Sequence, residues 1–212
     1  MEPAKNGKDK ILEKLRRGRK ERKEVPYSDP GWADPVFPHP DNLLETFRTE
    51  LEAVQGIVII EDSETELIGK IEQILAQRNL ESLYCLDGEL KKILSSHINI
   101  EYKADQFHSM QAAITRCEQL VARTGSVVVS SAHESGRRLN AFPSLHIIWA
   151  KSGQLVPFME DAIDAIMNRY GNNIPSLITS ITGPSRTADI EKTLVLGAHG
   201  PRELIVLINR NE

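Results

Sequence analysis

Long hydrophobic runs are absent from this 212-residue sequence, and cysteine occurs only twice. The longest apolar runs, such as residues 57–60 and 204–208, fall far short of the roughly 20 residues that a membrane-spanning helix requires. No basic and apolar leader opens the chain, so we expect a cytoplasmic protein. Cys85 and Cys117 each sit alone among apolar residues, a pattern that favours buried thiols over a disulfide, and two cysteines cannot hold an iron–sulfur cluster.

The common motifs for nucleotides, nucleophiles and metals are also absent. The sequence contains no Gly-x-Ser-x-Gly elbow, no Walker lysine loop and no GxGxxG. Its six histidines show no HxxxH or HExxH spacing, whereas zinc or iron needs three or four converging ligands. We therefore expect no metal site and no cofactor. His146 opens a predicted strand and fits a buried histidine as well as a site residue.

Aromatic residues make up 5% of the chain, and none lies in the basic segment from Lys10 to Glu24. Residues 1–24 hold ten Lys and Arg against five Asp and Glu, a net charge of +5, whereas the remainder carries −9. Because nucleic-acid-binding domains spread basic residues over the folded body and interleave aromatics, nucleic acid is an unlikely partner. The apolar stripe of a helix over residues 8–24 is thin, so such a helix docks weakly or on a partner.

The first 40 residues are predicted to form a basic helix and a proline-rich arm. Five prolines between residues 25 and 40 exclude regular structure there, and Trp32 and Phe37 pack either on their own domain or on a second subunit. We expect this arm to become ordered on a partner, with homo-oligomer formation through it as one possibility. Residues 41–212 are predicted to form one α/β domain.

The body alternates between short apolar strands and amphipathic helices. Residues 57–60 and 82–86 are typical of buried parallel strands, and the capping box Ser63–Glu66 starts a helix that continues to about residue 78. The other predicted helices begin at Asp41, span residues 88–94, and begin at Asp105 with an apolar face made of Phe107, Met110, Ile114, Cys117 and Val121.

Between residues 124 and 170 the links shorten. Thr124-Gly125-Ser126 opens a predicted strand over 127–130, and the polar loop 131–140 contains two arginines that are candidates for binding an anion. Residues 145–150 and 154–156 are predicted to form a hairpin about Lys151-Ser152-Gly153, and a helix is expected from Pro157 to Tyr170.

Residues 182–204 concentrate turn-forming, charged and hydroxyl residues. Gly183-Pro184-Ser185 ends an apolar strand, and residues 185–192 have a spacing compatible with a short helix capped by Ser185. Free backbone donors and a guanidinium at such a turn would attract a phosphate or carboxylate. Gly197–Pro201 forms a second loop before a last buried strand over 204–208. We predict a ligand site between the two loops.

The candidate residues follow from this pattern. His199 and Asp189 are candidates for moving a proton, and the candidate ligand-binding residues are Thr124, Gly125, Arg137, Arg138, Gly183, Ser185, Arg186, Thr187, Gly197 and Gly200. Each also has a structural interpretation: Ser185 as a helix cap, Arg186 and Asp189 as a surface ion pair, and His199 as a turn residue with positive φ.

Three motifs resemble those of the lactate utilization protein C family, the LUD domain. They are Thr124-Gly125-Ser126, the segment from Gly136-Arg137-Arg138-Leu139 through Pro143 to His146-Ile147-Ile148, and above all GPSRTADIEKTLVLGAHGPREL. The likeness covers residues 41–209 in organisation and residues 124–207 in recognisable motifs. The basic N-terminus is similar to the arginine-rich opening helix of that family.

The resemblance implies a three-layer α/β domain with a mostly parallel sheet and helices on both faces, similar to sugar-phosphate isomerase and coenzyme A transferase-like folds. It also implies a role in bacterial oxidation of L-lactate to pyruvate, alongside iron–sulfur oxidoreductase subunits, with this chain as the cluster-free partner. Two hypotheses remain open: a subunit that binds a small carboxylate or phosphate-bearing ligand, and an assembly module whose site has no chemistry.

Overall fold

The computed structural model describes residues 7–20, 37–101, 110–190, 193–197 and 199–211. The chain forms two compact units, Met1–Pro38 and His39–Glu212. In the first unit, helix α1 spans Gly7–Lys20 and exposes Ile11 and Leu15 at 61% and 64%. No helix among the described residues is long and apolar enough to cross a membrane.

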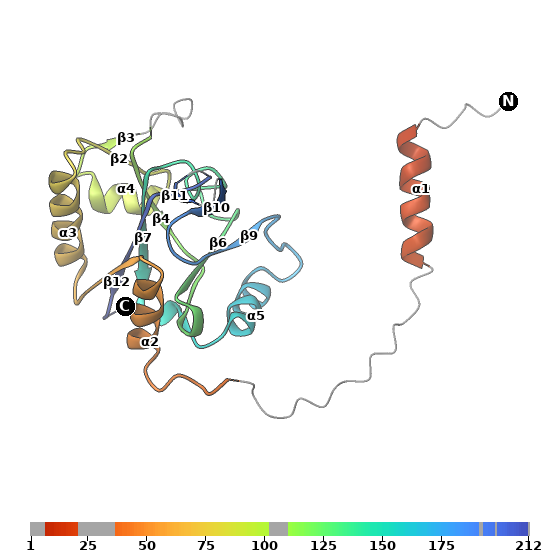
Figure 1. Ribbon diagram of the computed structural model, residues 1–212, viewed down its shortest axis with the longest axis horizontal. Coiled ribbons are helices and arrows are strands. Elements are labelled where there is room, and N and C mark those ends of the chain that lie inside the picture. Colours follow the sequence, from red (N-terminus) through yellow and green to blue (C-terminus); the bar gives the residue numbers. More distant parts are fainter. Residues whose placement is uncertain (1–6, 21–36, 102–109, 191–192, 198, 212) are drawn as a thin grey trace. The chain divides into compact units, whose positions relative to one another are not determined.

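A six-stranded sheet forms the centre of the second unit (Figure 1). Its order is β1-β12-β7-β4-β2-β3, and every neighbouring pair is parallel. The strands are β1 (Ile57–Glu61), β2 (Leu83–Tyr84), β3 (Ile100–Glu101), β4 (Ala112–Arg116), β7 (Leu145–Lys151) and β12 (Glu203–Asn209). The predicted α/β class with a mostly parallel sheet is confirmed.

One face of this sheet is covered by α3 (Glu64–Gln77) and α4 (Gly88–Leu94). Ser63 caps α3 as predicted: its Oγ accepts the backbone N–H of Glu66 at 3.3 Å. Alternate residues of the central strands face these helices because successive strand side chains point to opposite sides. The residues buried on this face include Leu67, Ile71, Leu90, Ile114, Ile147 and Leu207.

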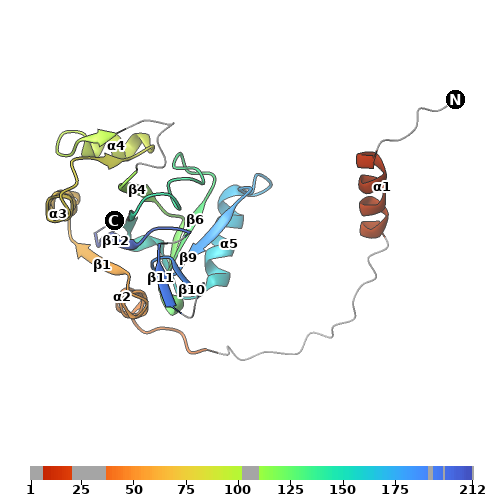
Figure 2. The ribbon, with the colours of Figure 1, turned by 45° about the horizontal axis from the view of Figure 1, so that its top comes forward.

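The opposite face packs on α2 (Leu43–Ala53) and on a second, four-stranded sheet. This sheet has the order β8-β5-β6-β9, with β5 (Gln119–Val121), β6 (Ser126–Ser130), β8 (Leu155–Val156) and β9 (Ile178–Ile181). Helix α5 (Met159–Tyr170) covers its far side, as Figure 2 shows, and Gly171 ends that helix as predicted. Helices therefore lie on both sides of the domain.

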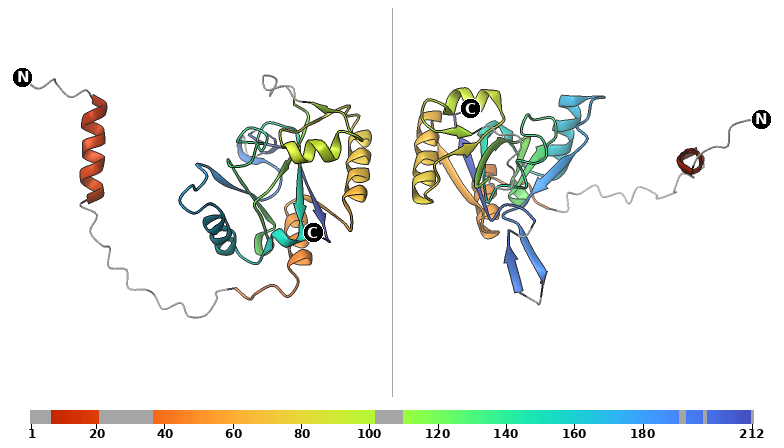
Figure 3. Two further views of the ribbon diagram at one scale, coloured as in Figure 1. Left: turned by 180° about the vertical axis from the view of Figure 1, so that it is seen from behind. Right: turned by 90° about the horizontal axis from the view of Figure 1, so that it is seen from above.

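Two short 3-10 turns connect strands: Ala122–Thr124 links β5 to β6 within the second sheet, and Ser152–Gln154 links β7 of the large sheet to β8 of the second sheet. A further antiparallel pair, β10 (Arg186–Ile190) and β11 (Thr193–Leu196), makes a separate two-stranded sheet. Figure 3 shows this β10–β11 hairpin extending away from the two larger sheets.

The predicted helix over residues 185–192 is wrong where the structure describes it, because residues 186–190 form strand β10. The prediction weighed the apolar pair Ala188 and Ile190, but two residues apart is the period of a strand rather than of a helix. Thr187 and Ile190 are also β-branched, which favours extended backbone. Ser185 consequently caps no helix.

The helix predicted from Asp105 is also wrong where the structure describes it. Residues 112–116 and 119–121 are strands β4 and β5, and Asp105 and Phe107 lie outside the described residues. The helix was predicted from apolar residues three or four apart, and that spacing also fits two short buried strands joined by a break at Cys117 and Glu118. Met110 is a core residue, as predicted.

The predicted hairpin over residues 145–156 does not form. Strand β7 pairs in parallel with β4 and β12, whereas β8 joins the other sheet beside β5. The turn at Ser152–Gln154 thus carries the chain between sheets instead of reversing it within one. A smaller correction concerns α2, which is capped by Asn42 rather than Asp41: the Asn42 side chain accepts the backbone N–H of Glu45.

Candidate functional site

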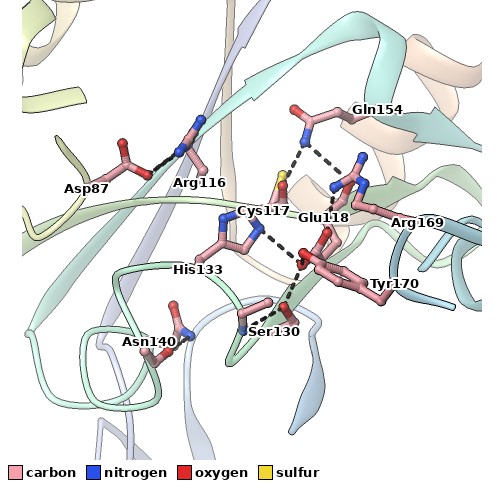
Figure 4. Close-up of polar contacts among 12 residues, drawn as sticks. Asp87, Arg116, Cys117, Glu118, Ser130, His133, Asn140, Gln154, Arg169 and Tyr170 are labelled. Carbon is pink, nitrogen blue, oxygen red and sulfur yellow. Dashed lines mark hydrogen bonds and ion pairs between the residues drawn. The ribbon is translucent and has the colours of Figure 1, made fainter. Parts of the chain in front are cut away.

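Charged side chains gather where β2 and β4 end. These strands are neighbours in the large sheet. After β2 the chain adds β3 on one side of the pair, and after β4 it adds β7 and then β12 on the other side. Ligands of open parallel sheets bind at the carboxyl ends of strands at such a switch point. Asp87 follows β2, and Arg116 at the end of β4 forms an ion pair with its carboxylate at 2.6 Å (Figure 4).

Glu118 lies two residues beyond β4 and is fully buried. Its Oε1 accepts hydrogen bonds from the Ser130 hydroxyl at 2.5 Å and the Tyr170 hydroxyl at 2.8 Å, and its Oε2 accepts one from Arg169 at 2.6 Å. His133 Nε2 lies 3.2 Å from Oε1, an ion-pair distance without hydrogen-bond alignment. Figure 4 shows this Glu118 cluster drawing side chains from β6, the following loop and α5 onto one carboxylate.

The Glu118 carboxylate is ionised at neutral pH. Burial raises the pKa of Glu118, but the contacts with His133, Ser130 and Tyr170 outweigh burial and lower it to about 2. Burial and the adjacent carboxylate raise the pKa of the Tyr170 hydroxyl. The ionised carboxylate lies against the His133 imidazole and can position it.

Cys117, which precedes Glu118, and Cys85 are buried free thiols of low reactivity. Burial raises the pKa of Cys117 to about 12 and that of Cys85 to about 11, so at pH 7 each thiol is protonated. Because the thiolate is the reactive form, we expect neither cysteine to react with a thiol-specific reagent such as a maleimide in the folded protein. Mass spectrometry of the folded chain should show no label, and denaturant should expose two sites. Rapid labelling of the folded chain would contradict this.

The two loops predicted to flank a site, residues 183–185 and 197–201, are hydrogen-bonded to each other. The Ser185 backbone N–H donates to the Pro201 carbonyl at 2.8 Å, and the Gly197 N–H donates to the Ser185 carbonyl at 2.9 Å. A pocket of about 340 Å³ opens there, lined by Ala141, Phe142, Gly197, His199 and Gly200. The predicted site residues Ser185, Gly197, His199 and Gly200 are thus brought together, at the amino ends of β7 and β12.

The side chain of Arg202 lies beside the glycine loop that lines this Phe142–His199 pocket. Arg202 packs on Gly197, so a Cβ placed on Gly197 would lie 3.0 Å from the Arg202 Nε. Arg138 precedes the pocket by one turn, since its carbonyl accepts the backbone N–H groups of Ala141 and Phe142 at 3.0 Å. An anion in the pocket would meet positive charge on this side.

Another group of predicted residues lies against helix α2. Arg186 donates from its guanidinium to the carbonyl of Val54, the C-cap of α2, and Gly183 packs on the same residue. Gly125 lies so close to α2 that a Cβ on it would be 2.6 Å from the Glu50 carbonyl carbon. The Thr124 hydroxyl bonds that of Ser126 at 2.7 Å. These contacts hold α2 on the second sheet.

The remaining predicted residues are dispersed. Arg137 donates to the Ser176 hydroxyl at 2.7 Å, on the side of the 131–140 loop that faces the segment between α5 and β9. Thr187 is half-buried in β10, and Asp189 lies in the same strand, with its side chain outside what is described. The residues predicted for one site therefore lie in at least three places.

The sequence interpretation missed Arg202 and the Glu118 cluster. Glu118 is the single acid between the buried residues Ile114 and Leu120, a signal for a buried, paired carboxylate that was hidden by the wrong helix assignment. His146 is buried, with its Nε2 2.9 Å from the Thr115 hydroxyl, and burial lowers its pKa to about 3. It is a core histidine. In the part of the chain that the structure describes, no three His, Cys, Asp or Glu side chains are grouped to hold a metal ion.

Several sequence relatives carry the name lactate utilization protein C. "Lactate utilization protein C" of Bacillus velezensis is 31% identical over 172 residues, covering 79% of this chain and 68% of that protein. The protein of the same name from Geobacillus thermodenitrificans is 29% identical over 189 residues, covering 79% of this chain and 78% of its own length. The Bacillus subtilis match is 40% identical but spans 101 residues, 47% of this chain and 41% of that protein.

Structural and family comparisons agree with this. A crystal structure of a duf162 family protein from Deinococcus radiodurans matches with a TM-score of 0.60 at 20% identity, covering 78% of this chain and 95% of that one, and shows a shared fold. A family model described as the LUD domain matches residues 89–208, more than half of the sequence. The resemblance of the GPSRTADIE motif is therefore confirmed, and the chain belongs to the LUD domain family.

Proposed function

We propose that this chain is an accessory subunit of bacterial L-lactate utilization in the cytoplasm, acting with iron–sulfur partner proteins that oxidise L-lactate to pyruvate. The names of its relatives support this role. Electron acceptance requires a cofactor, and the sequence contains no motif for one, so the isolated chain is expected not to oxidise lactate. Lactate oxidation by the purified chain alone would contradict this assignment.

The chain's own contribution is to bind a small carboxylate or phosphate-bearing ligand in the Phe142–His199 pocket. The observation that carries this proposal is the pocket itself, about 340 Å³ and lined by glycines and His199 from the second predicted loop. This volume lies in the range of small-molecule sites, about 300–1,000 Å³. Arg202 and Arg138 supply the charge that an anion needs, and His199 can donate a hydrogen bond or a proton.

Calorimetry with L-lactate, pyruvate, a sugar phosphate and coenzyme A tests the proposal. For whichever ligand binds, we expect Arg202→Gln to weaken binding about tenfold to a hundredfold, because it removes a charge-assisted contact worth about 1.5–3 kcal/mol. His199→Ala should weaken binding several-fold, because it removes a hydrogen bond worth about 1 kcal/mol. Arg210→Gln is the matched control, since Arg210 pairs with Asp62 on the surface. Equal weakening by the control, or no binding of any of the four compounds, would refute the pocket.

Arg186→Gln belongs in the same series. If Arg186 contributes to the ligand site, its replacement should weaken binding as Arg202→Gln does. If the guanidinium serves only to bond the Val54 carbonyl, the variant should lose stability and keep its affinity. Chemical denaturation measured beside calorimetry separates these outcomes.

A non-catalytic assembly module is the alternative function. The observation that favours it is that charged groups at the sheet's switch point are paired within the chain: Arg116 with Asp87 and Glu89, and Glu118 with four side chains. Calorimetry in the presence of the iron–sulfur partners distinguishes the two. An assembly module binds those proteins and no small anion.

A further inference from the structure

The β10–β11 hairpin is joined to the body only through a firmly held base. Ser185 bonds Pro201 and Gly197, Gly183 packs on Val54, and Arg186 donates to the Val54 carbonyl. Beyond this base the described strands pair with each other and with neither of the larger sheets. In the right-hand view of Figure 3 the hairpin projects well clear of the body. The hairpin is thus fixed at its base, and its outer edges pair with no described strand.

A two-stranded ribbon of this kind is marginally stable by itself in water. Its sequence, RTADIEKTLVL, is nevertheless rich in strand-forming residues, with Thr187, Ile190, Thr193 and Val195 all β-branched. An edge strand leaves a row of backbone donors and acceptors that can template pairing with another strand. The hairpin is therefore suited to add to a second sheet edge.

Such an edge exists on the same body. Strand β9 ends the four-stranded sheet, paired with β6 on one side and with no described strand on the other. Large apolar side chains beside it are exposed: Ile163 and Met167, one turn apart on α5, at 38% and 43%, and Ile174 and Leu177, between α5 and β9, at 43% and 38%. We call these four residues the α5 patch. These side chains offer apolar surface that a partner could cover.

We propose that the hairpin of one copy of this chain adds to β9 of a second copy and covers its α5 patch, in a reciprocal, two-fold dimer. Both complementary parts are on this chain, and their lengths match: β10 has five residues and β9 has four. Charge does not oppose the contact, because the charged residues of the two described hairpin strands are one Arg and one Asp, Arg186 and Asp189, and β9 carries no charge.

The hairpin cannot satisfy β9 of its own chain. The four-residue link 182–185 between β9 and β10 is held at Val54 and at Pro201, which directs the hairpin away from its own edge strand. A second copy meets no such restraint. In a two-fold arrangement each hairpin serves the other body, so the contact occurs twice and closes without forming a fibre. This inference needs neither the ligand pocket nor helix α1.

Sedimentation velocity of the full chain tests the dimer. We expect a dimer whose dissociation constant rises at least about tenfold in Met167→Lys, because a charge would enter an apolar contact. Ile163→Lys should act alike, so that one poorly folding variant does not decide the result. Ile57→Lys is the control: Ile57 is 40% exposed and lies on β1, an edge strand of the six-stranded sheet, whereas β9 belongs to the four-stranded sheet. A monomer at all concentrations, or a dimer broken by Ile57→Lys alone, overturns the proposal.

Cross-linking tests the specific pairing. One preparation carries Thr187→Cys in β10 and another carries Ser180→Cys in β9, and the native cysteines are buried. A short bismaleimide should join the two variants in a mixture and give much less product with either variant alone. Equal yields from the mixture and from either single variant would show that the hairpin does not meet β9 of the second copy. Loss of the mixed product on adding Met167→Lys to the Ser180→Cys chain is the expected confirmation.

Discussion

Glu118→Ala is expected to lower the free energy of unfolding at pH 7 by about 3–5 kcal/mol. Removing one member of a buried ion pair costs about this much, because its partners lose their contacts. Here the Ser130 hydroxyl would remain buried without its acceptor, and α5 would lose both Arg169 and Tyr170 as attachments to the second sheet. Urea denaturation of the two proteins measures the difference. A loss below about 1 kcal/mol would mean that the cluster adds little to stability.

The effect of Glu118 should depend on pH. Its pKa is about 2 in the folded protein against 4.5 for an ordinary glutamate, so its contribution is complete above about pH 4.5 and disappears as pH falls toward 2. Glu118→Gln should therefore match the unaltered protein more closely at pH 3 than at pH 7. Buried His146 acts over a higher window: the unfolded imidazole takes up a proton below about pH 6.5, and the folded one only near pH 3. Acid lowers stability through both groups.

Gly125→Ala is expected to cost about 3–5 kcal/mol or to prevent folding. Gly125 has a φ of 58°, in the left-handed region that costs other residues about 1–2 kcal/mol. The added methyl would also collide with the backbone of Leu51 and Glu50 in α2, which cannot move as a side chain can. Thermal denaturation followed by circular dichroism measures the loss.

Gly136→Ala is the control for this substitution. Gly136 has nearly the same φ, 59°, but no atom lies within 4 Å of the position of its Cβ. Its replacement should cost only the backbone term of about 1–2 kcal/mol. The difference between the two variants isolates the contact with α2. Equal losses would show that the close approach of Gly125 to α2 contributes nothing, and would reopen a ligand-binding role for Gly125.

The elements that were predicted correctly are those specified by local sequence signals. The capping box at Ser63, the apolar β1 and β12 runs, and Gly171 at the end of α5 each act within a few residues, and the structure contains all of them. The parallel sheet follows from that alternation of strands and helices. The failures occurred where partners distant in sequence decide, as in β4 and β5, whose apolar residues fit the spacing of a helix but pair as strands with distant segments.

The candidate site was predicted in part for the same reason. The two glycine-rich loops could be recognised as turns, and their closure at Ser185 and Pro201 follows from turn chemistry that is written locally. The Glu118 cluster joins residues up to 52 positions apart, and the α2 contacts of Arg186 span 132. No spacing within a segment reveals such pairs. Charge density in a sequence therefore indicated where polar residues gather, but not which of them meet.

The position of β12 has a consequence for how this chain acquires its structure. Strand β12 lies between β1 and β7, with Ile57 opposite Ile205, so the centre of the large sheet closes across almost 150 residues of chain. Contacts so distant in sequence slow folding, because the entropy of closing the loop is lost before the contacts form. During synthesis, the backbone edges of β1 and β7 that later pair with β12 stay unpaired until residues 203–209 leave the ribosome. We expect the nascent chain to depend on a chaperone in this interval.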